Sequence, residues 1–489
     1  MEYESVIGLE VHVQLKTKSK MFCGCPAGYQ DSVANSAVCP VCLGLPGALP
    51  VINGKAVEFT VMTGLALSCD IPEHSKFDRK NYPYPDLMKG YQISQFDMPL
   101  AVHGILEIDV EGTKRSIGID RVHLEEDAAK LQHHTGSSDD SYSLVDVNRA
   151  GVPLMEIVSD PDMRSADEAR AYLTTLHGIV QYLGVSAANM QEGNFRCDAN
   201  VSLRPKGSDT YGTKTEVKNM NSFRSVYLAI NYEIERQTKI LEEGGNITQE
   251  TRGWVDDREV TVSQRSKEQA HDYRYFPEPD LPPLVIRPDW VKEIKDSLPE
   301  LAQNKHDRFI NDHKLSEYDA AQLTSSKSVA DYYESVIEFY DVSAGQLPQF
   351  AKQASNWILG DLTRLLNSTE QSIEECKFIP NHLNDLIRLV DSDTLSVTMA
   401  KTVLEEAFGS GVNPSKIVSD KGLAQINDSS VVETAVVDVI NDNPKAVEDY
   451  HNGKESAAKF LVGQVMKLTK GQAKPDLVQS LIIEKLEHV

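Results

Sequence analysis

Alternating apolar and polar residues predict a β-strand near the start of the chain, over residues 7–15 (IGLEVHVQL). Apolar side chains take every second position, and Glu10, His12 and Gln14 take the positions between them. Successive side chains of a strand point to opposite faces, so one face would enter a core. The other face would carry a carboxylate, an imidazole and an amide. The same alternation predicts further strands over 196–204 and 214–219, whose polar faces carry Asp198 and Glu216.

Helical patterns are interleaved with these strands. Ser165 and Glu168 form a capping box before a stretch with helical apolar spacing, and Gly184 is placed to end that helix. A second helix is expected to start near Ser222 and to run toward 244–245. These elements predict an α+β fold, with a mainly antiparallel sheet and flanking helices.

Composition shifts divide the chain into three expected domains. The proline-rich segment 275–290 marks the end of the α+β domain, 1–292, and the pattern beyond it is helical. We expect a helical domain over 293–408 and a small helical tail domain over 409–489, with the segment GSGVNP (409–414) as the linker.

Charge and length limit the class of protein. The chain has 489 residues and a formal net charge of −24, which argues against a generally basic, nonspecific nucleic-acid binder. It has no run of eighteen apolar residues, and its N-terminus lacks the basic and apolar regions of a secretory signal. We therefore expect a cytoplasmic protein without a membrane contact.

Four of the seven cysteines lie close together, which predicts a metal site rather than disulfides in a cytoplasmic protein. Two closely spaced thiolate pairs can bind zinc tetrahedrally, and four protein ligands would make that zinc structural. The alternative is a set of reduced thiols without a metal. The expected zinc ligands are Cys23, Cys25, Cys39 and Cys42.

Acidic residues on several predicted strands are the second candidate site. Glu156 interrupts the apolar run VPLMEIV, and a buried carboxylate needs a cation or a metal as partner. Glu125 and Glu126 lie in HLEEDAAK. If these acids meet those of the other strands, we expect Mg²⁺ binding. Mg²⁺ prefers carboxylate ligands, and it retains water molecules at positions that a phosphate can take. The alternative for each acid is a surface position or a structural ion pair.

Two basic segments are candidate contacts for phosphate or nucleic acid. Residues 77–97 mix Lys80 and other basic residues with tyrosines and prolines, although an ordered surface loop is the simpler interpretation. In the tail, lysines share one side of a predicted helix together with Gly463, which leaves room for a nucleic-acid backbone. The alternative there is a solvated helix face. The tail lysines are Lys459, Lys467 and Lys470, extended by Lys474.

Familiar nucleotide motifs are absent from the sequence. It has no G-x₄-G-K-[ST] loop, no G-x-G-x-x-G and no H-E-x-x-H. ATP chemistry in this chain would need a less familiar, metal-centred site.

Long segments of the chain closely resemble one family, the B subunits of bacterial-type tRNA-dependent amidotransferases. They include IGLEVHVQLKTKSKMFC, SKFDRKNYPYPDLMKGYQISQFD, GIDRVHLEEDAAK, SLVDVNRAGVPLMEIVSDPD, EGNFRCDANVSLRP, KTEVKNMNSF and DYRYFPEPDLPPL, and FLVGQVMKLTKGQAKP resembles the family's tail. The family converts Glu-tRNA(Gln) to Gln-tRNA(Gln), or Asp-tRNA(Asn) to Asn-tRNA(Asn), with ammonia that an amidase-type A subunit releases from glutamine. A small C subunit completes the complex.

The resemblance implies a role for each candidate site. The N-terminal domain would be a kinase-like cradle that binds the aminoacyl-tRNA end and activates its carboxylate with ATP and Mg²⁺. The implied catalytic residues are Glu125, Glu126 and Lys80. The implied Mg²⁺ site comprises Glu10, His12, Glu126, Glu156, Asp198 and Glu216, with Glu125 as a further candidate.

Two other functions stay open at this point. One is a noncatalytic tRNA-binding or assembly subunit with structural zinc, and the other is a free-standing metal-dependent hydrolase. The sequence does not decide whether Glu-tRNA(Gln), Asp-tRNA(Asn) or both are substrates.

Overall fold

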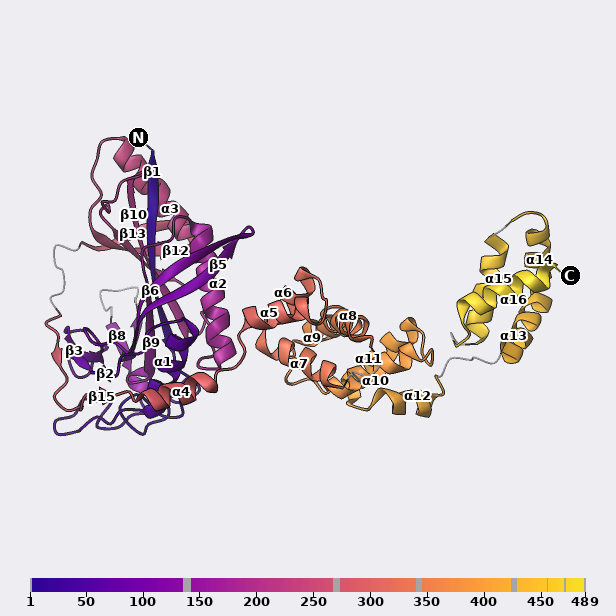
Figure 1. Ribbon diagram of the computed structural model, residues 1–489, viewed down its shortest axis with the longest axis horizontal. Coiled ribbons are helices and arrows are strands. Elements are labelled where there is room, and N and C mark those ends of the chain that lie inside the picture. The colour runs from indigo at the N-terminus through magenta and orange to yellow at the C-terminus, as the bar shows by residue number, and fades with distance from the viewer. Residues whose placement is uncertain are drawn as a thin grey trace. The chain divides into compact units, whose positions relative to one another are not determined.

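Eight strands of the N-terminal unit form one twisted sheet, in the order β13-β12-β11-β10-β1-β9-β6-β5 (Figure 1). Neighbours are antiparallel except β11 and β12, which are parallel. The computed structural model describes residues 2–134, 142–266, 273–339, 345–423, 429–454, 456–469 and 472–487. The strands are β1 (Tyr3–Gln14), β5 (Ala101–Val110), β6 (Thr113–Glu126), β9 (Pro153–Ser159), β10 (Phe195–Pro205), β11 (Thr215–Met220), β12 (Glu250–Val255) and β13 (Val260–Ser266).

Three helices cover the apolar face of this sheet: α1 (Gly54–Ala66), α2 (Ala166–Leu183) and α3 (Phe223–Glu242). Leu9, Val11 and Val13 of β1 belong to the same buried cluster as apolar residues of all three helices. The Ser165 hydroxyl caps α2 as predicted, and Gly184 ends it at φ 67°. The sequence-predicted α+β class, with a mainly antiparallel sheet, is confirmed.

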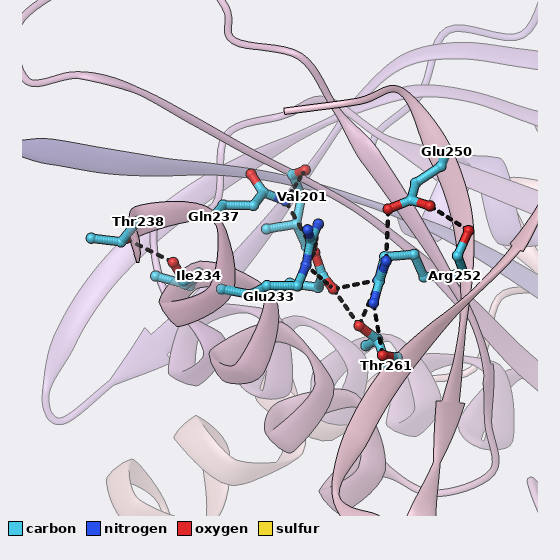
Figure 2. Close-up of polar contacts among 10 residues, drawn as sticks. Val201, Glu233, Ile234, Gln237, Thr238, Glu250, Arg252 and Thr261 are labelled. Carbon is cyan, nitrogen blue, oxygen red and sulfur yellow. Dashed lines mark hydrogen bonds and ion pairs between the residues drawn. The ribbon is translucent and has the colours of Figure 1, made fainter. Parts of the chain in front are cut away.

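A buried ionic network joins α3 to the edge strand β13 and to its neighbour β12 (Figure 2). The Glu233 side chain is fully buried and accepts hydrogen bonds from Arg236 (Nη2–Oε2 2.8 Å) and from Thr261. The Arg252 Nε lies 3.1 Å from the other Glu233 oxygen, and Gln237 also donates to Glu233. Two cations and two neutral donors thus satisfy one buried carboxylate, which fixes β12 relative to α3.

Small sheets and short helices complete the N-terminal unit, which spans Met1–Leu301. A three-stranded sheet lies beside β6, where β4 contacts it. Its strands are β14 (Phe276–Pro277), β3 (Asp78–Asn81) and β4 (Tyr91–Ser94). The remaining elements are β2 (His74–Ser75) with β15 (Leu284–Val285), β7 (Lys130–His134) with β8 (Tyr142–Asp146), the 3₁₀ turns η1 (Val147–Arg149) and η2 (Asp256–Arg258), and α4 (Pro288–Asp296).

All described elements of the second unit, Ala302–Val489, are helical. Its first apolar cluster, from Phe309 to Val418, joins helices up to α12. The segment 409–414 therefore lies within this cluster's helices, because it ends α11 and caps α12. The helices are α5 (Ala302–Asn311), α6 (Glu317–Thr324), α7 (Lys327–Glu338), α8 (Leu347–Trp357), the π-turn η5 (Ile358–Leu362), α9 (Thr363–Thr369), α10 (Pro380–Asp391), α11 (Val397–Ser410) and α12 (Pro414–Lys421).

The tail has a separate apolar cluster, from Val432 to Leu486. Its helices are α13 (Ser429–Asp442), α14 (Pro444–His451), α15 (Ser456–Leu468) and α16 (Pro475–Glu487). Across the described ranges, none of the helices combines the length and the apolar character that crossing a membrane requires.

Candidate functional site

Strand register gathers polar side chains on the sheet face opposite α1–α3. His12 of β1 lies opposite Arg196 on one neighbouring strand and opposite Glu156 on the other. Glu156 in turn lies opposite His123 of β6. Residues directly opposite each other in an antiparallel pair share a face and lie within contact distance. Histidines and acids far apart in sequence therefore meet across three strands.

One group of these residues forms the acid–histidine cluster, which comprises His12, His123, Glu125 and Glu156. The Glu156 Oε2 lies 3.3 Å from the Nε2 of His12 and 3.2 Å from that of His123. The His123 Nε2 also lies 3.8 Å from the Glu125 Oε2, which accepts a hydrogen bond from Ser94. One atom each of His12, Glu125 and Glu156 lies within 4.8 Å of the others, which is close enough for one metal ion.

The buried charges of the acid–histidine cluster stabilise one another. Burial opposes charge on both histidines, but the neighbouring acids, Glu156 first among them, together outweigh burial. They raise the pKa of His12, and they raise the pKa of His123 to about 9. Burial likewise opposes charge on Glu156, but His123 and His12 hold its pKa well below the ordinary value. The cluster therefore keeps its carboxylates ionised, which is the form that binds a cation, and a metal ion that took His12 as a ligand would release the proton of its imidazole.

Lys80 of β3 faces the acid–histidine cluster. Its ammonium lies 5.0 Å from the ring centre of Tyr273 and 5.9 Å from that of Tyr82. Burial opposes its charge, but Glu125 and then Glu156 contribute to a raised pKa. A permanent cation thus stands next to the two acids, where phosphate oxygens could also meet it.

A second group, the lysine-centred cluster, comprises Glu10, Asp198, Glu216 and Lys218. The Lys218 ammonium contacts Asp198 and lies 3.2 Å from Glu216, while Glu10 accepts from Asn200 at 2.8 Å. Glu10 lies two positions before His12, or about 7 Å away along the strand. With the exception of Glu126, the predicted metal-site acids thus fall into two neighbouring groups on one sheet face, and a lysine lies in the second.

Glu126 does not join either group. Its side chain contacts Lys89 and accepts the backbone N–H of Ile93 at 2.9 Å. Because Glu125 and Glu126 are consecutive in β6, they point to opposite faces. Glu126 instead lines a small cavity with Cys23 and Cys42.

The four predicted zinc ligands do converge. The sulfur atoms of Cys23, Cys25, Cys39 and Cys42 lie within 4.8 Å of one another, and the Cys39–Cys42 separation is 3.8 Å. Tetrahedral zinc with bonds of about 2.3 Å requires sulfurs about 3.8 Å apart. A hydrogen bond from Cys23 and another from the Cys39 backbone N–H help to lower the pKa of Cys42 to about 4. The donor set and its spacing fit zinc.

Only some of the predicted tail lysines lie on the same helix. Lys459 and Lys467 are exposed on α15, as is Gly463 between them, while Leu461 and Val465 are buried. Leu468 is exposed at the end of the helix. Lys474 precedes α16 and pairs with Asp393 at 2.7 Å. Lys470 lies outside the described residues.

Sequence reasoning missed two central residues, His123 and Lys218, as members of the site. His123 alternates with Glu125 along β6, so the pattern that pointed to His12 and Glu10 in β1 is also present there. The alternation puts Lys218 on the same strand face as Glu216, but only the ion pairs and charges of the folded chain show that it lies among three acids.

Comparisons with known proteins agree over the whole chain. Residues 5–292 match the family described as "GatB/GatE catalytic domain", and residues 331–486 match the "GatB domain". The chain is 54% identical to the B subunit of the aspartyl/glutamyl-tRNA(Asn/Gln) amidotransferase of Carboxydothermus hydrogenoformans, over 99% of both chains. It is 54% identical to the corresponding protein of Moorella thermoacetica, over 99% of this chain and all of the relative. The chain therefore belongs to the family of aspartyl/glutamyl-tRNA(Asn/Gln) amidotransferase B subunits.

Proposed function

We propose that the acid–histidine cluster is where this protein activates the side-chain carboxylate of Glu-tRNA(Gln), Asp-tRNA(Asn) or both with ATP. The observation that carries the proposal is the meeting of His12, Glu125 and Glu156 within 4.8 Å, beside Lys80. An acid-rich buried site with an adjacent lysine suits a reaction in which negative charge moves between phosphates and a carboxylate.

The metal that best fits these residues is Mg²⁺. Mg²⁺ is commonly held by one or two carboxylates while substrate phosphates and water fill its other positions. Glu125 and Glu156 would supply the carboxylates, with His12 as the third member. When bound, the ion would offset the charge on the phosphates of ATP.

The proposed reaction has two steps. An oxygen of the substrate carboxylate attacks the γ-phosphorus of ATP. The bond between that phosphorus and the oxygen of ADP breaks, and ADP leaves with its electron pair. Ammonia then attacks the acyl carbon, inorganic phosphate leaves with the electrons of the carbon–oxygen bond, and the nitrogen loses one proton to give the amide. Lys80 is placed to stabilise charge on the transferred phosphoryl group. In the lysine-centred cluster, Lys218 would face phosphate while Glu10, Asp198 and Glu216 hold it in place.

The other candidate sites receive supporting roles. We assign a structural zinc ion to the four cysteines, whose sulfurs leave no place for a substrate. We assign tRNA phosphate contacts to the exposed lysines of α15, together with Lys470 and Lys474. Ammonia would come from glutamine through an amidase-type A subunit, with a small C subunit in the same complex.

Reconstitution of the three-subunit complex tests the proposal. Glu125→Gln should abolish glutamine-dependent transamidation while glutaminase activity of the partner subunit remains. Glu107→Gln is the matched control, because Glu107 is exposed on β5 of the same sheet. A Glu125→Gln complex that transamidates at the wild-type rate would contradict the proposal and favour a noncatalytic subunit.

A further inference from the structure

An aromatic pair lies at the edge of the small sheet that carries Lys80. Phe96 follows β4 and Tyr275 precedes β14, and their rings are stacked, with centroids 4.2 Å apart and planes inclined by 9°. Phe96 is nevertheless 57% exposed. One ring face thus contacts Tyr275, and much of the remaining side chain is open to solvent.

Buried polar contacts hold the backbone of Phe96 in place, and the stack on Tyr275 holds its ring. The backbone N–H of Phe96 donates to Asp78 Oδ2 at 3.1 Å, and the Lys76 ammonium donates to the other Asp78 oxygen at 2.6 Å. Asp78 itself is buried. Single exposed apolar residues are common on proteins. A fixed ring that already stacks on another is different, because it offers a flat surface at little further cost in conformational entropy.

The pair is also close to the acid–histidine cluster. Ser94, two residues before Phe96, donates to Glu125 Oε2 at 3.0 Å, and two residues span at most about 7 Å. Burial raises the pKa of Tyr275; Lys80 opposes this effect, while Glu125 and Glu156 add to it. The charged residues of the cluster thus lie within electrostatic range of Tyr275, whose ring contacts Phe96.

We propose that Phe96, backed by Tyr275, is a stacking platform for the adenine base of an adenosine-containing substrate. The inference rests on the proposed function, because it takes the acid–histidine cluster as the place of reaction. Aromatic side chains bind bases by stacking on their flat faces. Two substrates of the proposed reaction supply this base: ATP, and the adenosine at the 3′ end of tRNA.

The test uses the reconstituted complex with Phe96→Ala and Phe96→Trp. Loss of a base–aromatic stack should raise the KM of the substrate whose base it binds by about 5- to 100-fold, whereas Trp should keep KM near that of the wild type. Phe339→Ala is the matched control, because Phe339 is an exposed phenylalanine at the end of α7. Its KM values should not change.

Two arms separate the sources of adenine. A raised KM for ATP with an unchanged KM for aminoacyl-tRNA identifies ATP. The reverse result identifies the tRNA end, and then Phe96→Ala should add no further loss for a tRNA whose terminal nucleotide lacks its base.

Unchanged KM values for both substrates in an active Phe96→Ala complex would overturn the platform and leave the proposed function standing. Dissociation of the subunits on size-exclusion chromatography would also overturn it, because Phe96 would then be an interface residue. A wild-type complex without ATP-dependent transamidation would instead overturn the proposed function.

Discussion

His12 and His123 share a single carboxylate oxygen, because the Oε2 of Glu156 lies within 3.3 Å of the Nε2 of each. The three residues come from β1, β6 and β9, so this one contact ties neighbouring strands together on the polar face of the sheet. Glu156 is buried, and both imidazoles depend on its charge.

We therefore expect Glu156→Gln to affect both stability and activity. Removing the charge from a buried ion group leaves the opposite charges uncompensated, which costs about 3–5 kcal/mol. Urea unfolding of the full chain should show an N-terminal unit destabilised by this order, and transamidation should be lost. A loss of activity at wild-type stability would show that Glu156 does not neutralise the histidines.

Thr251 is expected to position Glu216. Its hydroxyl donates to Glu216 Oε2 at 2.7 Å from the adjacent strand β12, which the Glu233–Arg252 contact fixes to α3 (Figure 2). Glu216 holds Lys218 in the proposed site, and a hydrogen bond to a charged group contributes about 1.5–3 kcal/mol, which corresponds to roughly 10- to 100-fold in rate. Thr251→Val should lower kcat by about this factor with little change in the KM for tRNA.

Thr251→Ser is the matched control, because it keeps the hydroxyl that the valine variant lacks. A serine variant as slow as the valine variant would mean that the threonine methyl group, and not the hydrogen bond, matters.

The cysteine cluster predicts one zinc ion per chain. Cys39→Ser should release the metal and destabilise the N-terminal unit while tRNA binding by the tail remains. Elemental analysis of protein purified without chelator measures the metal directly, and zinc-free wild-type protein would contradict the assignment.

Lys20 offers a finer test of the zinc site. It is fully buried, its ammonium donates to the Ala37 carbonyl at 2.9 Å, and its charge helps to lower the pKa of Cys42. Zinc with four thiolates has a net charge of −2, since +2 − 4 = −2, so a nearby cation should stabilise it. Lys20→Met should bind zinc more weakly in chelator competition than Lys20→Arg.

The exposed lysines of α15 should contact tRNA phosphates. Each phosphate contact releases counterions, so Lys459→Ala/Lys467→Ala should weaken tRNA binding and flatten its salt dependence by about one to two units of slope. The KM for aminoacyl-tRNA should rise while kcat stays similar, because phosphate contacts of this kind bind the substrate and the transition state equally.

Lys292→Ala/Lys295→Ala is the control for charge alone, because both lysines are exposed on α4 in the other unit. Equal salt slopes for the two double variants and the wild type, measured over about 50 to 200 mM salt, would mean that α15 has a solvated face only.

Much of this architecture could be predicted from residue pattern alone. The alternation in β1 identified both its buried face and the side of His12, and the apolar run around Glu156 identified a carboxylate that needed a cation. The capping residue Ser165 and the terminal Gly184 gave the ends of α2 within a residue, because these signals are local.

What the sequence did not reveal depends on strand register. No local pattern states that His123 lies opposite Glu156, or that Lys218 lies beside Asp198. Strand alternation does explain why the side chains of Glu125 and Glu126 point to opposite faces. That conclusion requires knowing that β6 continues through both residues. Pairing over long sequence distances therefore divides one expected metal site into two groups.

Phosphate transfer to the substrate carboxylate is the most direct test of the account. A reconstituted complex without glutamine or ammonia would receive ATP labelled at the γ-phosphate together with Glu-tRNA(Gln) or Asp-tRNA(Asn). The account predicts that label reaches the aminoacyl-tRNA with the wild type and with Glu107→Gln, and that transfer is lost with Glu125→Gln. Equal transfer with Glu125→Gln, or no transfer to either tRNA by an active wild-type complex, would contradict it.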